Sequence, residues 1–198
     1  MKTPLIILDG GHGKETPGKR SPVWSDGAQL FEYEFSRDIV HRISDELLRL
    51  RIPHCILVPE VNDIPLSERV QRANRLNYQN GGNCFLLSIH ANAAQKINTA
   101  TGWECHIYTD KTRSKDFAVL LANEANDEFA PEWKIRQSLS NQPYWISNLQ
   151  ILRETNCPAV LTENFFMDNE KDCRFILSDE GRDRIARMHA AAIKRITI

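Results

Sequence analysis

Short apolar runs alternate with amphipathic segments along this chain of 198 residues. The apolar runs have the length of β-strands and lie at 5–8, 54–59, 83–91, 102–108 and 159–163. Helical periodicity is found at 30–47, 66–78, 114–130 and 181–196, with a short helical turn at 148–154. This alternation predicts an α/β fold, with a largely parallel twisted sheet flanked by helices on both faces. Because the length suits one core and no linker divides the chain, we expect a single domain over residues 1–198.

The balance of charge excludes an obvious polyanion partner. The chain has 25 basic and 26 acidic residues, for a formal net charge of -1. A protein that binds nucleic acid normally carries a basic surplus, so we expect no nucleic-acid partner. No apolar stretch approaches the roughly 18 residues of a membrane span, so we expect no membrane insertion.

The cysteines and the N-terminus indicate where the chain is made. Five widely spaced cysteines, an odd number with no C-x-x-C pair, favour free structural thiols and synthesis in a reducing compartment. The first apolar run is too short for a signal peptide, so we expect synthesis in the cytoplasm without one. A sequence trimmed of its signal would look the same.

Three predicted strands end in side chains suited to catalysis. His12 follows the first strand inside a glycine-rich segment, His90 ends the third, and Glu163 ends a later one. In parallel sheets the ligand site lies beyond the carboxyl ends of the strands, so these residues are expected at one edge. Two histidines with one carboxylate form a common protein ligand set for catalytic zinc. Taken singly, each histidine is explained equally well as a polar residue of a turn or strand end; taken together, they favour a metal.

The glycines around His12 and the acidic residues of the next helix complete this prediction. Gly11 and Gly13 bring no side chain and accept positive φ, which lets the backbone approach a metal closely. Helical geometry then favours Glu32 over Glu34 as the carboxylate ligand. Glu32 shares the inward face of the helix, whereas Glu34 lies on its charged face.

Glu163 has two interpretations from the residues alone. It follows an apolar run, so partial desolvation would raise the pKa of its carboxyl toward neutral pH, as a general base or acid requires. A structural glutamate paired with Arg153 accounts for the same residues equally well.

The motifs as a set resemble a known family. Residues 7–13 (ILDGGHG) are similar to the opening D-x-G-H-G of zinc-dependent N-acetylmuramoyl-L-alanine amidases of the amidase-3 family. Residues 32–40 (EYEFSRDIV) resemble its glutamate-led helix, and residues 88–93 (SIHANA) resemble its S-x-H-A-N-A segment. Residues 158–169 (PAVLTENFFMDN) resemble P-A-V-L-x-E-x-G-F-x-x-N, which carries its catalytic glutamate. The blocks occur in family order between residues 5 and 169.

The resemblance implies a single-domain, phosphorylase/hydrolase-like α/β fold and one Zn²⁺ per chain held by His12, Glu32 and His90. It implies Glu163 as the general base and acid, peptidoglycan as the substrate, and cleavage between N-acetylmuramic acid and L-alanine. With no visible export signal, the chain resembles a phage or prophage endolysin catalytic domain that acts on the cell wall.

Two segments depart from the family pattern. Residues 14–25 are longer and more basic than its short glycine turn, and Phe165 stands where the pattern has glycine. The alternatives are a zinc carboxypeptidase-like or other small-substrate amidohydrolase, and a wall-binding module without turnover. A structural zinc site in such a module would normally have four protein ligands.

Overall fold

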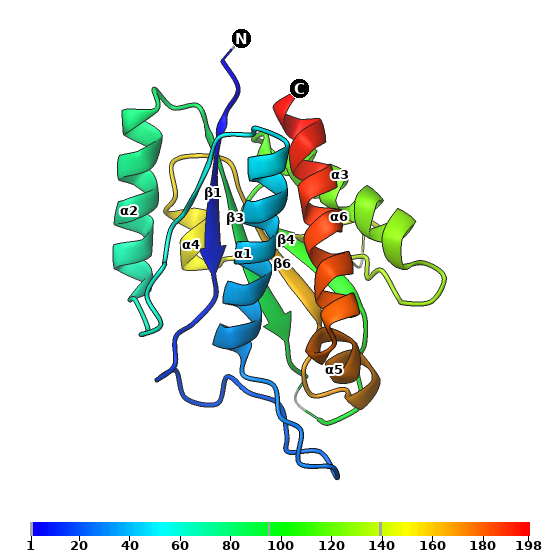
Figure 1. Ribbon diagram of the computed structural model, residues 1–198. Helices are drawn as coiled ribbons and strands as arrows, with labels where there is room; N and C mark the ends of the chain where they lie inside the picture. Colours follow the sequence, from blue (N-terminus) through cyan, green and yellow to red (C-terminus); the bar gives the residue numbers. More distant parts are fainter. Residues whose placement is uncertain (1, 95, 139) are drawn as a thin grey trace.

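The computed structural model describes residues 2–94, 96–138 and 140–198 (Figure 1). The secondary structure, in chain order, is β1 (Leu5–Gly10), α1 (Glu32–Arg49), β2 (His54–Ile56), α2 (Leu66–Gln79), β3 (Cys84–Asn92), β4 (Trp103–Ile107), α3 (Ser114–Phe129), β5 (Trp145–Ile146), α4 (Gln150–Arg153), β6 (Ala159–Phe166), α5 (Glu170–Leu177) and α6 (Asp179–Thr197).

The strands form one six-stranded sheet in the order β2-β1-β3-β6-β4-β5. Neighbouring strands among β2, β1, β3 and β6 are parallel, whereas β4 is antiparallel to β6 and parallel to β5. The predicted α/β fold with a largely parallel sheet is confirmed, and the reversed pair is a feature the sequence did not predict. Its cause is the short connection at 93–102. A parallel arrangement needs a crossover of a dozen or more residues, so β4 starts at the edge where β3 ends and runs back.

Helices cover both faces of this sheet, as predicted. Alternate residues of the strands point to opposite faces, which divides the core into two clusters. One cluster packs beneath α1, α3, α5 and α6, and it takes Ile6 and Leu8 from β1. The other packs beneath α2 and α4 and takes Ile7 from the same strand. Figure 1 shows α1 and α6 side by side across one face, and the two helices are in contact.

The helices follow the apolar spacing of the sequence, but their ends were predicted less well. Along α1 the residues at intervals of four, Phe35, Ile39, Ile43 and Leu47, are all fully buried. The N-cap of α2 is Pro65, and no side chain caps this helix. The helix α5 was not predicted; the side chain of its N-cap, Asn169, accepts a hydrogen bond from the backbone of Asp172.

The cysteines are free, as expected. Four are buried and Cys55 is half-buried. Burial raises the pKa of Cys55 to about 11 and that of Cys157 to about 12, so neither thiol ionises near neutral pH. Within the described ranges, no helix is both long and apolar enough to cross a membrane.

Candidate metal and catalytic site

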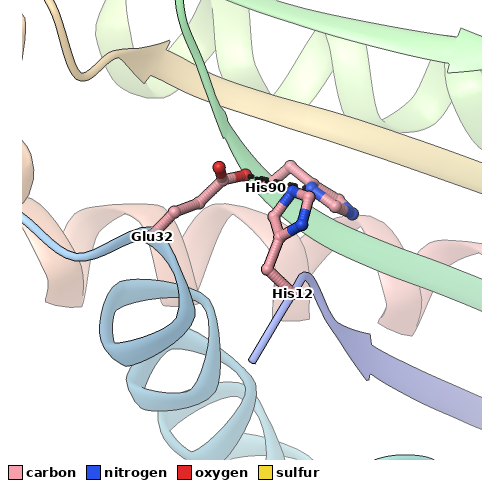
Figure 2. A group of neighbouring side chains, drawn as sticks. All are labelled: His12, Glu32 and His90. Carbon is pink, nitrogen blue, oxygen red and sulfur yellow. Dashed lines mark hydrogen bonds and ion pairs between the residues drawn. The ribbon is translucent and has the colours of Figure 1, made fainter. Parts of the chain in front are cut away.

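The three predicted ligands converge at the carboxyl edge of the sheet (Figure 2). His12 follows β1, His90 lies on β3, and Glu32 is the first residue of α1. Glu32 Oε1 lies 3.3 Å from His12 Nε2 and 3.0 Å from His90 Nδ1, and the two imidazole rings meet edge to face with centroids 4.9 Å apart. One candidate ligand atom from each residue lies within 4.8 Å of the others. Glu34, by contrast, is exposed and accepts a hydrogen bond from the Tyr33 hydroxyl (2.8 Å).

Glu163 lies beside this cluster. It is the register partner of His90 on the neighbouring parallel strand, so both side chains project from the same face of the sheet. The Oε2 atom of Glu163 is buried and has no hydrogen-bond partner in the part of the chain that the structure describes. Burial raises the pKa of this carboxyl to about 8; the charge of His90 opposes the shift, and the carboxylates of Glu32 and Glu104 add to it. Arg153 instead forms an ion pair with Glu154 (2.7 Å), so the paired-glutamate alternative does not hold.

The ionisation states of His12, Glu32 and His90 depend on one another. Burial alone would raise the pKa of Glu32, but its hydrogen bonds with His12 and His90 outweigh burial and lower it well below the usual range. Burial lowers the pKa of His12, whereas for His90 the hydrogen bond and charge of Glu32 overcome burial and raise it. Glu32 is therefore an anion between two imidazoles.

The donor set fits a divalent metal ion. Two imidazole nitrogens and one carboxylate oxygen are the ligands that zinc accepts in catalytic sites. Glu32 is also 1% exposed, and its Oε2 atom is buried without a hydrogen-bond partner among the described residues. Buried carboxylate oxygens are rarely left unsatisfied in folded proteins; Lys19 Nζ approaches this one only to 3.9 Å, and a metal ion would satisfy it.

Two arginines fix the backbone that carries His12. This residue has φ 57°, a left-handed conformation that costs a non-glycine residue about 1–2 kcal/mol. Its carbonyl oxygen accepts hydrogen bonds from Arg37 Nη2 (2.8 Å) and Arg69 Nη2 (2.9 Å). Arg37 also donates to the carbonyl of Gly11 (3.0 Å), and Arg69 to that of Gly10. Three consecutive carbonyl groups are thus bound by guanidinium groups, which offsets the strain at His12.

Arg69 belongs to a buried polar network behind the site. It is 2% exposed and pairs with Asp9 Oδ1 (2.8 Å), while Asp9 Oδ2 accepts a hydrogen bond from Ser88 (2.6 Å). This network links the ends of β1 and β3, which carry the two histidines. Neither arginine was predicted from the sequence; the only available signal was the aspartate in the first motif, which needs a buried cation as its partner.

The glycines around His12 are required by close contacts. A methyl group at Gly11 would overlap the imidazole ring of His90, and one at Gly13 would overlap the backbone of Asp63. The expected close approach to the backbone of these glycines is therefore present, and the groups that make it are the ring of His90 and the backbone of Asp63. Neither glycine has positive φ, because among residues 11–13 only His12 has it.

Phe165 occupies the position where the family pattern has glycine, and it has φ 68°. Its side chain is fully buried, with ring centroids 5.2 Å from Phe129, 5.2 Å from Trp133 and 5.0 Å from Phe175. The pairing of β6 with β3 shifts in register here, just after His90. The left-handed turn that glycine permits is thus kept, and aromatic packing offsets its cost.

A cavity of about 250 Å³ opens beside the two histidines. It is lined by Asp9, His12, Thr16, Asp63, Ile64, Pro65, Leu66, Arg69, His90 and Ile151. The site is thus accessible to a substrate from the face of the sheet that carries α2 and α4.

Comparison with models of known protein families shows to which family this chain belongs. The family model described as N-acetylmuramoyl-L-alanine amidase matches residues 6–195. The chain belongs to this family. The resemblance inferred from the motifs is confirmed, and so is the prediction that the chain is an enzyme of this type.

Curated relatives cover nearly all of this amidase. An endolysin of Bacillus phage SPP1 is 27% identical over 97% of this chain and 65% of its own length. The sporulation-specific N-acetylmuramoyl-L-alanine amidase of Bacillus subtilis (strain 168) is 27% identical over 96% of this chain and 67% of its own length. The relatives thus include a phage endolysin and a cellular amidase, and this chain spans about two thirds of the length of each.

Solved structures share the fold. N-acetylmuramoyl-L-alanine amidase from Clostridium difficile 630 aligns with a TM-score of 0.83 at 23% identity, covering 98% of this chain and 96% of that chain. AmiC2 of Nostoc punctiforme aligns with a TM-score of 0.82 at 22% identity, with the same coverage. These neighbours confirm the predicted fold class.

Proposed function

We propose that this amidase uses zinc to hydrolyse the amide bond between N-acetylmuramic acid and the L-alanine of the peptidoglycan stem peptide. Membership of the amidase family supports the bond and the substrate. The observation that carries the catalytic assignment is the position of Glu163, which faces the same side of the sheet as His90 and has a buried oxygen without a protein partner.

In this proposal His12, Glu32 and His90 hold one zinc ion. Bound zinc would lower the pKa of a water molecule to about 7 and polarise the scissile carbonyl. Glu32 contributes the negative charge of the ligand set, and Arg37 and Arg69 keep the His12 imidazole directed toward it. The protein thus supplies three ligands and leaves the remaining coordination to water and substrate.

Glu163 moves the protons. Its Oε2 atom accepts a proton as water adds to the carbonyl carbon, and the same carboxyl returns a proton to the nitrogen of L-alanine as the C–N bond breaks. Burial raises the pKa of this carboxyl in the metal-free protein, toward the range in which one group can both accept and donate a proton near neutral pH. General acid–base catalysis of this kind typically contributes about 10²–10⁴-fold.

Mass spectrometry of digested peptidoglycan tests the proposed bond. An amidase releases complete stem peptides that begin with L-alanine and leaves the glycan strands intact. Release of single C-terminal amino acids would instead indicate the carboxypeptidase-like alternative. Binding to sacculi without any release would indicate a wall-binding module.

Two glutamate variants test the catalytic role. Glu163→Gln should keep about one zinc per chain and lose about 10²-fold or more in activity, because the amide cannot accept the proton. Glu34→Gln is the matched control, since that side chain is exposed and lies outside the cluster. If Glu163→Gln digests sacculi at close to the wild-type rate, the assignment of Glu163 is wrong even where zinc is present.

A further inference from the structure

A second cavity adjoins the candidate metal site on the side of the long basic loop. This rim cavity has a volume of about 290 Å³ and is formed by residues 13–20 together with Phe31 and Tyr33. It meets the metal site at Lys19, whose Nζ lies 3.9 Å from Glu32 Oε2. In Figure 1 the loop projects beyond the carboxyl ends of the strands, where the site is built.

Cationic groups dominate the lining of the rim cavity. Lys14, Lys19 and Arg20 stand against a single acidic residue, Glu15, in a chain whose formal net charge is -1. Lys14 and Arg20 are exposed, and neither side chain forms an ion pair with any residue that the structure describes.

Arginines elsewhere on the surface are mostly paired with carboxylates. Arg42, for instance, binds Asp179 at 2.8 Å, and Arg184 binds Glu128 at 2.8 Å. Lys14 and Arg20 are therefore available to a ligand, and guanidinium and ammonium groups are strong donors to carboxylates.

The loop is held in place by its own contacts. Thr16 Oγ1 accepts a hydrogen bond from the backbone of Gly13 (3.0 Å) and donates one to Asp63 Oδ2 (2.6 Å). The backbone of Lys14 donates to the carbonyl of Val61 (3.0 Å), and Arg20 forms a β-bridge with Phe31. The cationic groups thus extend from an anchored backbone, which reduces the entropy lost when a ligand is bound.

We propose that the rim cavity binds a free carboxylate of the stem peptide, with Lys14 and Arg20 as its receptors. The inference rests on the proposed function and names the part of the substrate that this loop recognises. Stem peptides carry carboxylates on residues that follow L-alanine, so a peptide whose scissile amide lies at the metal site extends past the ligands. The rim cavity borders that site, because Lys19 Nζ lies 3.9 Å from Glu32 Oε2 and Thr16 lines both the rim cavity and the cavity beside the histidines.

The test compares two soluble N-acetylmuramoyl peptides, one with free carboxylates and one with the same carboxylates amidated. KM and kcat are measured for the zinc-loaded wild type, for Lys14→Gln/Arg20→Gln, and for Lys111→Gln/Arg187→Gln. The last pair is the matched control: it removes the same charge from exposed positions outside the rim cavity.

For the wild type we expect a KM about 10-fold lower for the free-carboxylate peptide, and Lys14→Gln/Arg20→Gln should abolish this preference by raising that KM. The control pair should keep the preference. Dissociation constants of the free-carboxylate peptide, measured with Glu163→Gln as the parent protein, should show the same loss without turnover. Equal wild-type KM values for the two peptides would overturn the inference and leave the proposed function intact. Failure of the wild type to release peptide from either substrate would overturn both.

Discussion

Glu163 should make the metal-free protein less stable as the pH rises toward 8, and Glu163→Gln should remove that effect. The carboxyl has a pKa of about 8 in the folded protein against 4.5 for the unperturbed group, because burial disfavours its ionised form. Between these two values the folded chain holds a proton that the unfolded chain has released. The stabilising contribution is therefore complete below pH 4.5 and is lost as the pH rises through 8.

The size of the effect follows from the shift. A difference of one pKa unit corresponds to about 1.4 kcal/mol, so the full shift is worth about 5 kcal/mol. Between pH 5 and pH 8 roughly 3 kcal/mol of this should be lost from the free energy of unfolding. Few other single groups would contribute as much, since the total stability of a domain is about 5–15 kcal/mol.

Urea denaturation of both proteins at pH 5, 6, 7 and 8, after removal of metal, measures this difference. The glutamine variant should gain stability relative to the wild type at each step, because it has no proton to lose. Titration of the two histidines affects both proteins, so it largely cancels in the comparison. If the two free energies of unfolding run parallel within about 0.5 kcal/mol over this range, Glu163 is not the desolvated carboxyl described here.

Four further substitutions test the geometry of the site. Glu32→Ala should lose zinc, whereas Glu34→Ala should retain about one zinc per chain; metal analysis after dialysis checks both, and the reverse pattern would contradict the helix register. Gly11→Ala should weaken zinc binding at least 10-fold in a chelator competition, because its methyl group displaces the ring of His90. Unchanged affinity would mean that the two groups are not in contact. Arg69→Met should lower the free energy of unfolding by about 3–5 kcal/mol, since it leaves a buried carboxylate unpaired. A loss below about 1 kcal/mol in urea denaturation would show that the network is not structural.

The sequence predicted the parts of the fold that depend on local periodicity. The apolar spacing of α1 and the continuous apolar runs of β1, β3 and β6 gave the elements, and the strand ends then indicated the edge at which polar residues would meet. The position of β4 in the sheet could not be predicted in the same way. It depends on which strand becomes its neighbour, and β6 enters the sheet more than fifty residues later.

The backbone conformation at the site was the other feature that could not be predicted from the sequence. The glycines in the first motif can accept positive φ, yet the structure has it at His12 between them, where two arginines from α1 and α2 bind the carbonyl. Phe165 is a second non-glycine residue with positive φ near the site. The family pattern has glycine at that position, and here the left-handed turn persists beneath an aromatic cluster that forms only in the folded chain.

The positions of the chain ends determine from which side the protein can be attached to a support. In Figure 1 both ends of the described chain lie at one end of the molecule, and the carboxyl ends of β1 and β3 point to the opposite end. A linker joined to Ile198 would therefore leave from the side away from His12 and the basic loop. Coupled to a bead or a sensor surface through that residue, the protein would present the edge that carries His12, Glu32 and His90 outward, toward a polymer too large to diffuse into the support.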